Sequence, residues 1–227
     1  MLKVENIEVN GFEAAIRGMR NPMNSWDKSD SVFCDEEGCC VCKYTCRDNE
    51  HVKWEEADLG YCIGCNDMKL MQQLFKAGTE HRKYMRMITV SMDITAPLYW
   101  WKEFDTYKVG TVANSCSTMH KIHAKRFTEE DFSMEHLEPE YAVPTMRNTI
   151  MALNMFREQY RAHGRVSHWL QMIQLLPSSY NQKRTVMMNY EVAFNIMKQR
   201  SAHKLNEWHV LVDELKHLPF MLDIVEG

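Results

Sequence analysis

The most regular alternation of hydrophobic and polar positions in the chain lies over residues 88–95. Apolar Ile88, Val90, Met92 and Ile94 alternate with polar Thr89, Ser91, Asp93 and Thr95. A period of two residues predicts a β-strand with one buried face. Residues 2–11 alternate more loosely, with a change of phase at Glu5 and Asn6, and predict a second strand.

Helical spacing of apolar residues predicts three helices in the first half of the chain. The first covers 12–19 and is stopped by Pro22; the second covers 66–77, with Asn66 as N-cap and Gly78 just past its end. The third covers 97–109, with Pro97 in its first turn. Its stripe of Trp100, Phe104 and Tyr107 assigns Trp100 to the core. Trp101 lies on a neighbouring face, where we expect core or interface packing and where contact with a ligand ring is the alternative.

The second half of the chain shows helical periodicity almost throughout. Thr128 with Asp131 indicates a short capped helix, and four longer stripes follow over 146–160, 165–176, 186–197 and 205–215. Strands early and helices late predict an α+β fold. We expect one domain over residues 1–227, with a cysteine-rich insertion over residues 33–66.

Composition is that of an ordinary globular protein, with 45% hydrophobic and 26% charged residues. The net charge of −4 predicts no general affinity for nucleic acid or an acidic membrane. The apolar runs are too short to span a bilayer, and the first residues lack the apolar block of a secretory signal. These observations predict a cytoplasmic protein without a membrane partner.

Cysteine is concentrated in one acidic segment. Seven of the eight cysteines lie between Cys34 and Cys65, and residues 27–58 hold ten acidic and four basic residues. Two C-x-x-C pairs can close a tetrahedral zinc site, so we expect structural zinc on Cys39, Cys42, Cys62 and Cys65. Cys40 could replace Cys39, and an iron–sulfur cluster or reduced cysteines without metal are the alternatives.

Residues 74–117 resemble the core of the flavin-dependent thymidylate synthase family. "LFKAG…ITVSMDITAPLYWWKEF" follows the family's helix, strand and "AP" entry into a second helix. The family's R-H-R-x-x-S-x-N-E-x-S-x-R signature is then altered: "TYK" stands at R-H-R, and "NSCSTM" keeps only Asn114 and Ser117. Glu103 stands where the family has glutamine.

The C-terminal half extends this resemblance. "LLPSSYNQKRTVMMNYEVAFNIMKQRSAHKLNEW" is similar to the family's last conserved region, with Asn189, Asn195 and Arg200 at the matching spacing. The arginine that precedes Leu-Pro in the family has no counterpart here. If one helix held residues 189 to 200, Asn189 and Arg200 would point the same way, about 20° apart and ~16 Å along the axis. From periodicity alone, the solvated face of an amphipathic helix is the favoured interpretation, and only the resemblance reverses it.

The resemblance implies a thymidylate synthase-complementing-protein-like fold, with an antiparallel or mixed sheet and a long helical C-terminal half. It implies FAD as cofactor and a dUMP-like pyrimidine nucleotide and reduced folate as partners. A homotetramer is also implied, with one-carbon transfer as the reaction. A catalytically inactive nucleotide-binding or regulatory protein on the same scaffold is the alternative.

The same resemblance assigns roles to individual residues. The implied cofactor-binding residues are Asn189, Asn195, Lys108, Tyr107, Thr106 and His81. The implied substrate-binding residues are Asn114, Ser117, Glu103 and Arg200, and Arg200 is also the implied catalytic residue. Ser and Thr at these positions have a structural alternative, which is to satisfy a bent junction between a helix and a loop.

Overall fold

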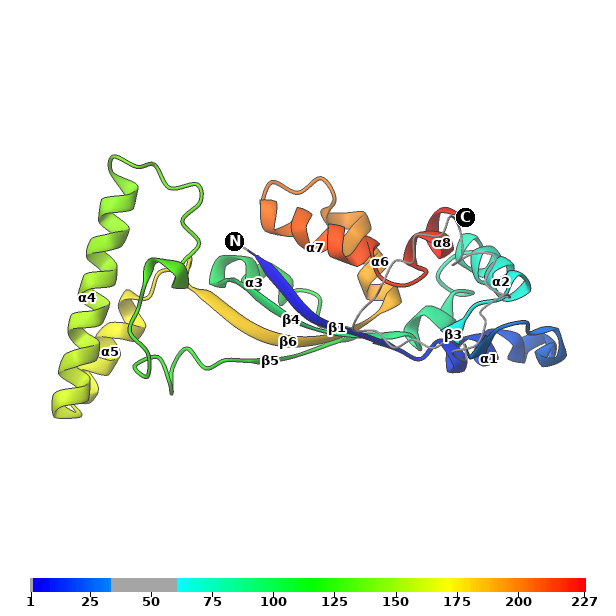
Figure 1. The fold of residues 1–227 in the computed structure, drawn as a ribbon, viewed down its shortest axis with the longest axis horizontal. Helices are drawn as coiled ribbons and strands as arrows, with labels where there is room; N and C mark the ends of the chain where they lie inside the picture. The colour runs from blue at the N-terminus through cyan, green and yellow to red at the C-terminus, as the bar shows by residue number, and fades with distance from the viewer. Residues whose placement is uncertain (1, 34–60) are drawn as a thin grey trace. The chain divides into compact units, whose positions relative to one another are not determined.

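The structure is a computed structural model that describes residues 2–33 and 61–227 (Figure 1). The chain divides into two compact units. We call Met1–Lys3, Asp93–Tyr107 and Ala113–Thr185 the α4–α5 unit. Val4–Met92, Lys108–Val112 and Val186–Gly227 form the α6–α8 unit.

The described residues form two sheets. Strands β1 (Lys3–Asn10), β4 (Thr89–Pro97), β6 (Asn181–Asn189) and β5 (Thr111–Ser115) lie in the order β1-β4-β6-β5. A separate antiparallel pair, β2 (Val32–Phe33) and β3 (Tyr61–Cys62), sets Val32 opposite Cys62. This mixture of sheet and helix confirms the α+β prediction.

Eight α-helices lie in the described part of the chain. They are α1 (Phe12–Arg20), α2 (Cys65–Lys76), α3 (Leu98–Phe104), α4 (Ala142–His163), α5 (Val166–Leu175), α6 (Tyr190–Arg200), α7 (Asn206–Lys216) and α8 (Met221–Glu226). Not one of these described helices combines the length and the hydropathy that crossing a bilayer requires.

Several local predictions are confirmed in detail. β4 buries Val90, Met92 and Ile94 as its alternation predicts. In β1, Asn6 has a φ of 53°, which explains the change of phase read in the sequence. Thr128 and Asp131 form a reciprocal capping box at the start of a 3₁₀ turn.

The largest error of the sequence-based prediction lies at residues 181–189, which form β6. The predicted helix from residue 186 starts only at Tyr190, because Val186 and Met188 are fully buried while Met187 between them is exposed. That alternation has the period of a strand. β5 was missed because its side chains are mostly exposed and leave no apolar period. α3 ends at Phe104, so Tyr107 lies beyond it.

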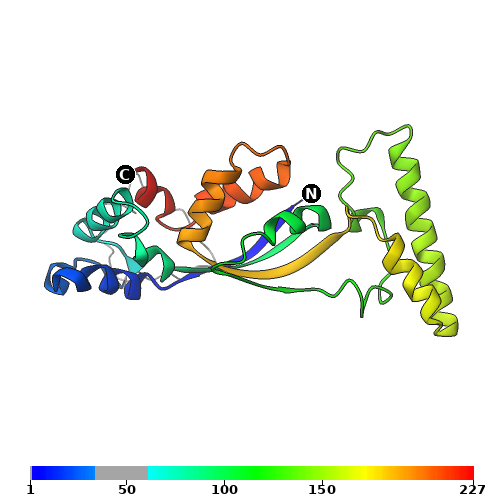
Figure 2. The ribbon, with the colours of Figure 1, turned by 180° about the vertical axis from the view of Figure 1, so that it is seen from behind.

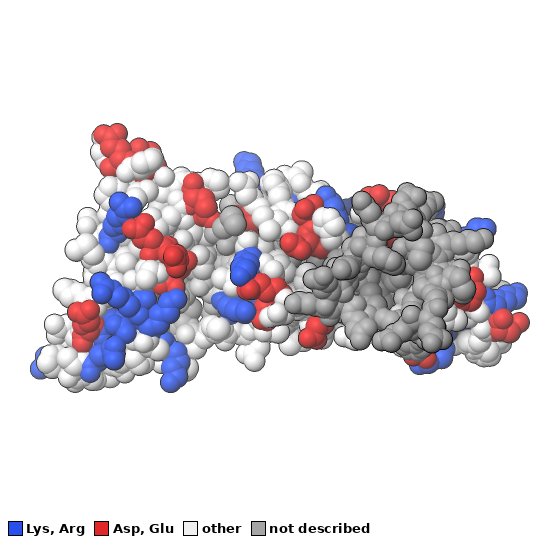
Figure 3. All heavy atoms as spheres, viewed as in Figure 1, with Lys and Arg blue, Asp and Glu red and all other residues white. Residues whose placement is uncertain are grey.

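In the α4–α5 unit, α4 and α5 lie side by side (Figures 1 and 2). Ile150, Leu153 and Met172 pack with Phe127 and Phe132 from the preceding loop. These contacts give this unit a core of its own. Lys and Arg side chains gather over the C-terminal half of α4 and the loop beside it (Figure 3).

The two adjacent tryptophans belong to a second part of that unit's core. Trp100 and Trp101 are at most 1% exposed, and the Trp101 indole donates to the carbonyl of Gln182 at 2.9 Å. The Arg184 guanidinium lies 4.2 Å from the centroid of the Trp101 ring and donates to Asp105 at 2.7 Å. Both tryptophans therefore pack in the core, as the helical stripe predicted for Trp100 and as the favoured interpretation held for Trp101.

In the α6–α8 unit, buried Tyr190 connects α6 to distant segments. Its hydroxyl donates to the carbonyl of Pro219 at 2.7 Å, and its backbone N–H donates to Ile88 at 3.0 Å. Its ring meets that of Phe12 edge to face, with the centroids 5.6 Å apart. Burial raises the pKa of the Tyr190 hydroxyl well above its ordinary value, so it stays a neutral donor.

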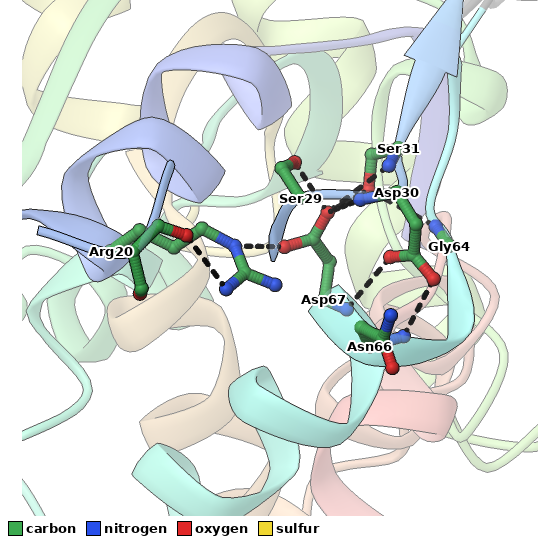
Figure 4. A network of polar contacts seen from close by, with 8 residues as sticks. Arg20, Ser29, Asp30, Ser31, Gly64, Asn66 and Asp67 are labelled. Atoms are coloured by element: carbon green, nitrogen blue, oxygen red, sulfur yellow. Dashed lines mark hydrogen bonds and ion pairs between the residues drawn. The ribbon is translucent and has the colours of Figure 1, made fainter. Parts of the chain in front are cut away.

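A buried carboxylate, Asp67, joins α1 and α2 to the segment before β2 (Figure 4). Its Oδ1 accepts from Arg20 Nε at 2.6 Å. Its Oδ2 accepts from the backbone N–H groups of Asp30 and Ser31, both at 3.1 Å, and from the hydroxyls of Ser29 and Ser31. These contacts satisfy a charge that would otherwise be expensive to bury.

Asp30 completes a reciprocal arrangement with Asp67. The Asp30 carboxylate accepts from the N–H groups of Asn66 at 2.9 Å and Asp67 at 3.1 Å, and so caps α2. Asn66, the predicted N-cap, is instead a recipient of that cap, and Gly64 holds the N-cap position. A Cβ at Gly64 would lie 2.2 Å from Asp30, so only glycine fits there.

We predict that Asp67→Asn destabilises the protein by about 3–5 kcal/mol, because Arg20 would keep a buried charge without its partner. Chemical denaturation measures this change. Burial opposes ionisation of Asp67, but the hydrogen bonds from Ser31, Ser29 and Arg20 and the Arg20 charge hold its carboxyl pKa below the ordinary value. The stabilisation is therefore complete above the unfolded pKa of about 4. It is lost as the pH falls through the folded pKa.

Glu13→Gln provides the matched control. Glu13 forms an i,i+4 ion pair with Arg17 on α1, and both side chains are more than half exposed. Removing this pair should change the free energy of unfolding by less than about 0.5 kcal/mol. Equal effects of the two substitutions, or the same acid sensitivity in wild type and Asp67→Asn, would contradict the assignment.

Candidate functional site

The N-terminus of α6 brings together two segments of the α6–α8 unit. Asn189 is the N-cap, and its Oδ1 accepts from Val192 N at 3.0 Å. Gly110 lies against it: a Cβ there would be 3.1 Å from Asn189 Nδ2 and 3.0 Å from Val192. Gly110 also has a φ of +80°, so two independent reasons favour glycine at this position.

Only one of the two polar atoms of the Asn189 side-chain amide makes a hydrogen bond with the described residues. Oδ1 makes the cap, whereas Nδ2 makes no hydrogen bond with the described residues. The sequence assigned Asn189 to cofactor binding and missed its capping role, although the β6-to-α6 junction is a position that asparagine favours. One side chain therefore has a structural acceptor and an available donor.

Asn195 and Arg200 lie further along α6. The half-buried amide of Asn195 makes no side-chain hydrogen bond within the described part of the chain. Arg200 is the last residue of α6, and its guanidinium carbon lies 4.5 Å from the centroid of the fully buried Trp208 ring. Trp208 was not predicted as part of a site, and it fixes the position of the cation by a cation–π contact.

Two other predicted cofactor residues of this unit are exposed. Lys108 lies two residues before Gly110 and makes no ion pair with the described residues, and the side chain of His81 makes no hydrogen bond or ion pair with them. Arg82 is different: it forms a bidentate contact with Glu191 and lies 5.1 Å from the ring centroids of both Phe75 and Phe194. Because its charge is already neutralised, Arg82 is a poor candidate for binding a phosphate.

The remaining predicted residues belong to the α4–α5 unit. Glu103 lies on α3, while Thr106 and Tyr107 follow its end. The Thr106 hydroxyl donates to the carbonyl of Glu103 at 2.7 Å. This bond supports the structural alternative for Thr106, because it closes the end of the helix.

Asn114 and Ser117 have different surroundings within the same unit. The exposed side chain of Asn114, on β5, makes no hydrogen bond with the described residues. Ser117 Oγ accepts from the N–H groups of Met119 at 3.2 Å and His120 at 2.9 Å, which organises a turn. Asn114 is therefore the more available of these two predicted substrate contacts.

The predicted zinc ligands fall on both sides of the described boundary. Cys39 and Cys42 lie outside the described residues. Cys62 is disulfide-bonded, whereas Cys65 is a free, partly buried thiol at the first position of α2. No group of three metal-binding side chains occurs among residues 2–33 and 61–227, so the described chain gives the zinc prediction no support.

Sequence comparison and structure comparison give different results for this chain. No protein-family model matches it, and no curated protein matches it at a significant level. The structure is similar to thymidylate synthase X (ThyX) from Helicobacter pylori, solved with FAD and dUMP. The TM-score is 0.65 at 15% identity, and the match covers 98% of this chain and 96% of that chain.

Two further solved structures agree. A second complex of H. pylori ThyX with FAD and dUMP gives a TM-score of 0.63 at 15% identity, covering 97% of this chain and 96% of that chain. The UMP/dUMP methylase PolB from Streptomyces cacaoi, bound with 5-Br dUMP, gives 0.58 at 9% identity, covering 95% and 88%. This chain therefore has the fold of the flavin-dependent thymidylate synthases.

Proposed function

We propose that this protein binds FAD and a dUMP-like pyrimidine nucleotide and transfers a one-carbon unit to the pyrimidine. The observation that supports this most is the extent of the fold match, which covers nearly the whole of this chain and of ThyX solved with FAD and dUMP. Fold alone does not specify activity, so the proposal also depends on the side chains around α6.

Side chains of the α6–α8 unit would supply the hydrogen-bond donors and the cation that a flavin cofactor needs. Asn189 Nδ2 and the amide of Asn195 would donate to the ring system, since neither makes a hydrogen bond with the described residues. Lys108 would contact the cofactor's phosphates as an exposed cation near the start of α6. Bound FAD would supply the hydride chemistry that this chain's side chains lack.

Arg200 would orient the pyrimidine. A guanidinium held against the Trp208 ring has lost much of its rotational freedom, so less entropy remains to be lost when it meets a carbonyl oxygen. Its charge would favour negative charge that develops on that oxygen during transfer. In the proposed reaction, Arg200 binds and polarises the pyrimidine, and no protein nucleophile takes part.

Two parts of the proposal extend beyond a single chain and its nucleotide. We propose a reduced folate as the donor of the one-carbon unit and a homotetramer as the assembly. Asn114 projects from an exposed strand, so a second subunit would supply the walls that a substrate site needs. An inactive nucleotide-binding protein is the alternative function, since "TYK" in place of R-H-R removes two charged guanidinium groups.

Purified protein reconstituted with FAD should retain the cofactor through gel filtration and show flavin absorbance in a near-stoichiometric amount. Binding should also raise the melting temperature, because a ligand that binds only the folded state stabilises it. Protein that stays colourless after incubation with excess FAD would overturn the enzymatic proposal. Retention of FAD and dUMP without methylation would favour the inactive alternative.

Substitutions at Asn189 separate the cap from the cofactor contact. Asn189→Ala should lose about 0.5–2 kcal/mol of stability together with FAD affinity, because it removes both amide groups. Asn189→Ser keeps a capping oxygen for Val192 N but lacks the amide donor. We expect it to retain most of the stability and still bind FAD about tenfold more weakly, which flavin fluorescence titration measures. Unchanged FAD affinity in Asn189→Ser would restrict Asn189 to capping.

Arg200→Gln should weaken dUMP binding by about 10–100-fold, the value of one charge-assisted hydrogen bond. Calorimetric titration of the FAD-loaded protein with dUMP measures this loss. Lys198→Gln is the matched control, because Lys198 is an exposed cation on the same helix with no predicted role. Equal weakening by both substitutions would show that general charge, and not the Arg200 position, governs binding.

A further inference from the structure

Basic residues are concentrated in two stretches of the α4–α5 unit that are far apart in sequence. Residues 116–126 and 157–174 together hold six Lys or Arg residues and one Glu, although the whole chain has a net charge of −4. Figure 3 shows Lys and Arg side chains gathered on one face, over the C-terminal half of α4 and the neighbouring loop. The net charge of the chain therefore does not reveal the positive electrostatic potential at this surface.

Specific contacts bring the two stretches together. Buried Arg157 on α4 donates to the carbonyls of His123 at 3.0 Å and Ala124 at 3.3 Å. The Trp169 indole on α5 donates to the carbonyl of Met119 at 3.0 Å. The loop therefore lies along α4, and Arg161, one turn after Arg157, is on the helix side that faces this loop.

We define the basic face as Lys121, Lys125, Arg126, Arg161 and Arg165. All five residues are exposed. Lys125 pairs with Asp131 at 2.7 Å, whereas the other four make no ion pair with the described residues. The positive charge of Arg161, in the last turn of α4, also interacts favourably with the helix dipole and stabilises the helix by about 0.3–1 kcal/mol. That effect does not explain the cations on the loop.

We infer that the basic face binds single-stranded nucleic acid through its sugar–phosphate backbone. Asn154 and Arg157 hold the loop along the last turns of α4, so the loop cations and Arg161 lie on one surface, where a sugar–phosphate backbone would contact more than one of them. Three of the five cations are arginines, which suit the bidentate geometry of phosphate oxygens. None of the five residues of the basic face is a side chain that the proposed function uses.

Aromatic rings beside the cations favour an unpaired strand over other anionic partners. His123 and Tyr160 are half-buried and meet edge to face with ring centroids 4.9 Å apart, and Trp169 lies near the same loop. Tyr160 and Trp169 also pack partly against the core of this unit, so the part of each ring that stays exposed is what a base would meet. Stacking of an unpaired base on an aromatic ring contributes about 1–3 kcal/mol. In a duplex the bases already stack on one another, so a duplex would gain no stacking energy from these aromatic rings.

Fluorescence anisotropy with a labelled single-stranded oligonucleotide tests this inference. If about four cations displace counterions, affinity should fall roughly fiftyfold between about 50 and 200 mM salt. The double substitution Lys121→Glu and Arg161→Glu should weaken binding at least tenfold and reduce the salt dependence. The milder Lys121→Gln and Arg161→Gln pair gives the same readout if the reversed charges impair folding.

Lys198→Glu with Lys216→Glu is the control pair, because both residues are exposed, lie in the other unit and change the net charge equally. The control should bind like the wild type. Absence of binding at about 50 mM salt, or equal loss in the control, would overturn the inference. So would tighter binding to a duplex or to anionic lipid vesicles, or displacement of the oligonucleotide by dUMP at an equal phosphate concentration. None of these outcomes depends on whether FAD binds.

Discussion

The buried pair of Asp67 and Arg20 connects segments that chain order keeps apart. One carboxylate receives five hydrogen bonds from α1 and from residues 29–31, while Asp30 returns two to the start of α2. Burying an ion pair is favourable only when the remaining polar groups are satisfied as well. This arrangement meets that condition and connects the segment before β2 to the start of α2, which follows β3.

The start of α6 combines stability and binding in the same residue. Asn189 ends β6 and caps α6 with its oxygen, so the strand-to-helix change occurs at a defined residue. Its amide nitrogen remains available beside Gly110, where a side chain would fill the space. Fewer residue types can replace Asn189 than could replace a residue with only one of these roles. The reason is that few side chains supply an acceptor and a donor in the same geometry.

Charge in this protein acts locally. Arg82 is neutralised by Glu191 between two phenylalanine rings, and Arg184 by Asp105 above Trp101, so both serve packing. Lys108 and four cations of the basic face have no such partner among the described residues. The position of each guanidinium or ammonium group, and not the total charge, separates structural cations from those open to a ligand.

The sequence by itself determined the elements with strong periodicity, including β4, α1, α4 and α5, and the capping box at Thr128. It also pointed to the fold that the structural comparison found. It failed at β6, where helical spacing continued into a strand, and at β5, whose exposed residues carry no apolar period. The local pattern of hydrophobic residues does not indicate which backbone segments form hydrogen bonds with each other in a sheet.

Only the tertiary structure showed how individual side chains are used. Arg82 and Arg200 are both arginines in the sequence, yet Arg82 contacts Glu191 between two phenylalanine rings and Arg200 lies over the ring of Trp208. Likewise, the basic residues near 121 and 161 form one surface because Arg157 holds the loop to α4. The availability of a charge or an amide is set by neighbours that are distant in sequence, and those neighbours are defined only when the chain folds.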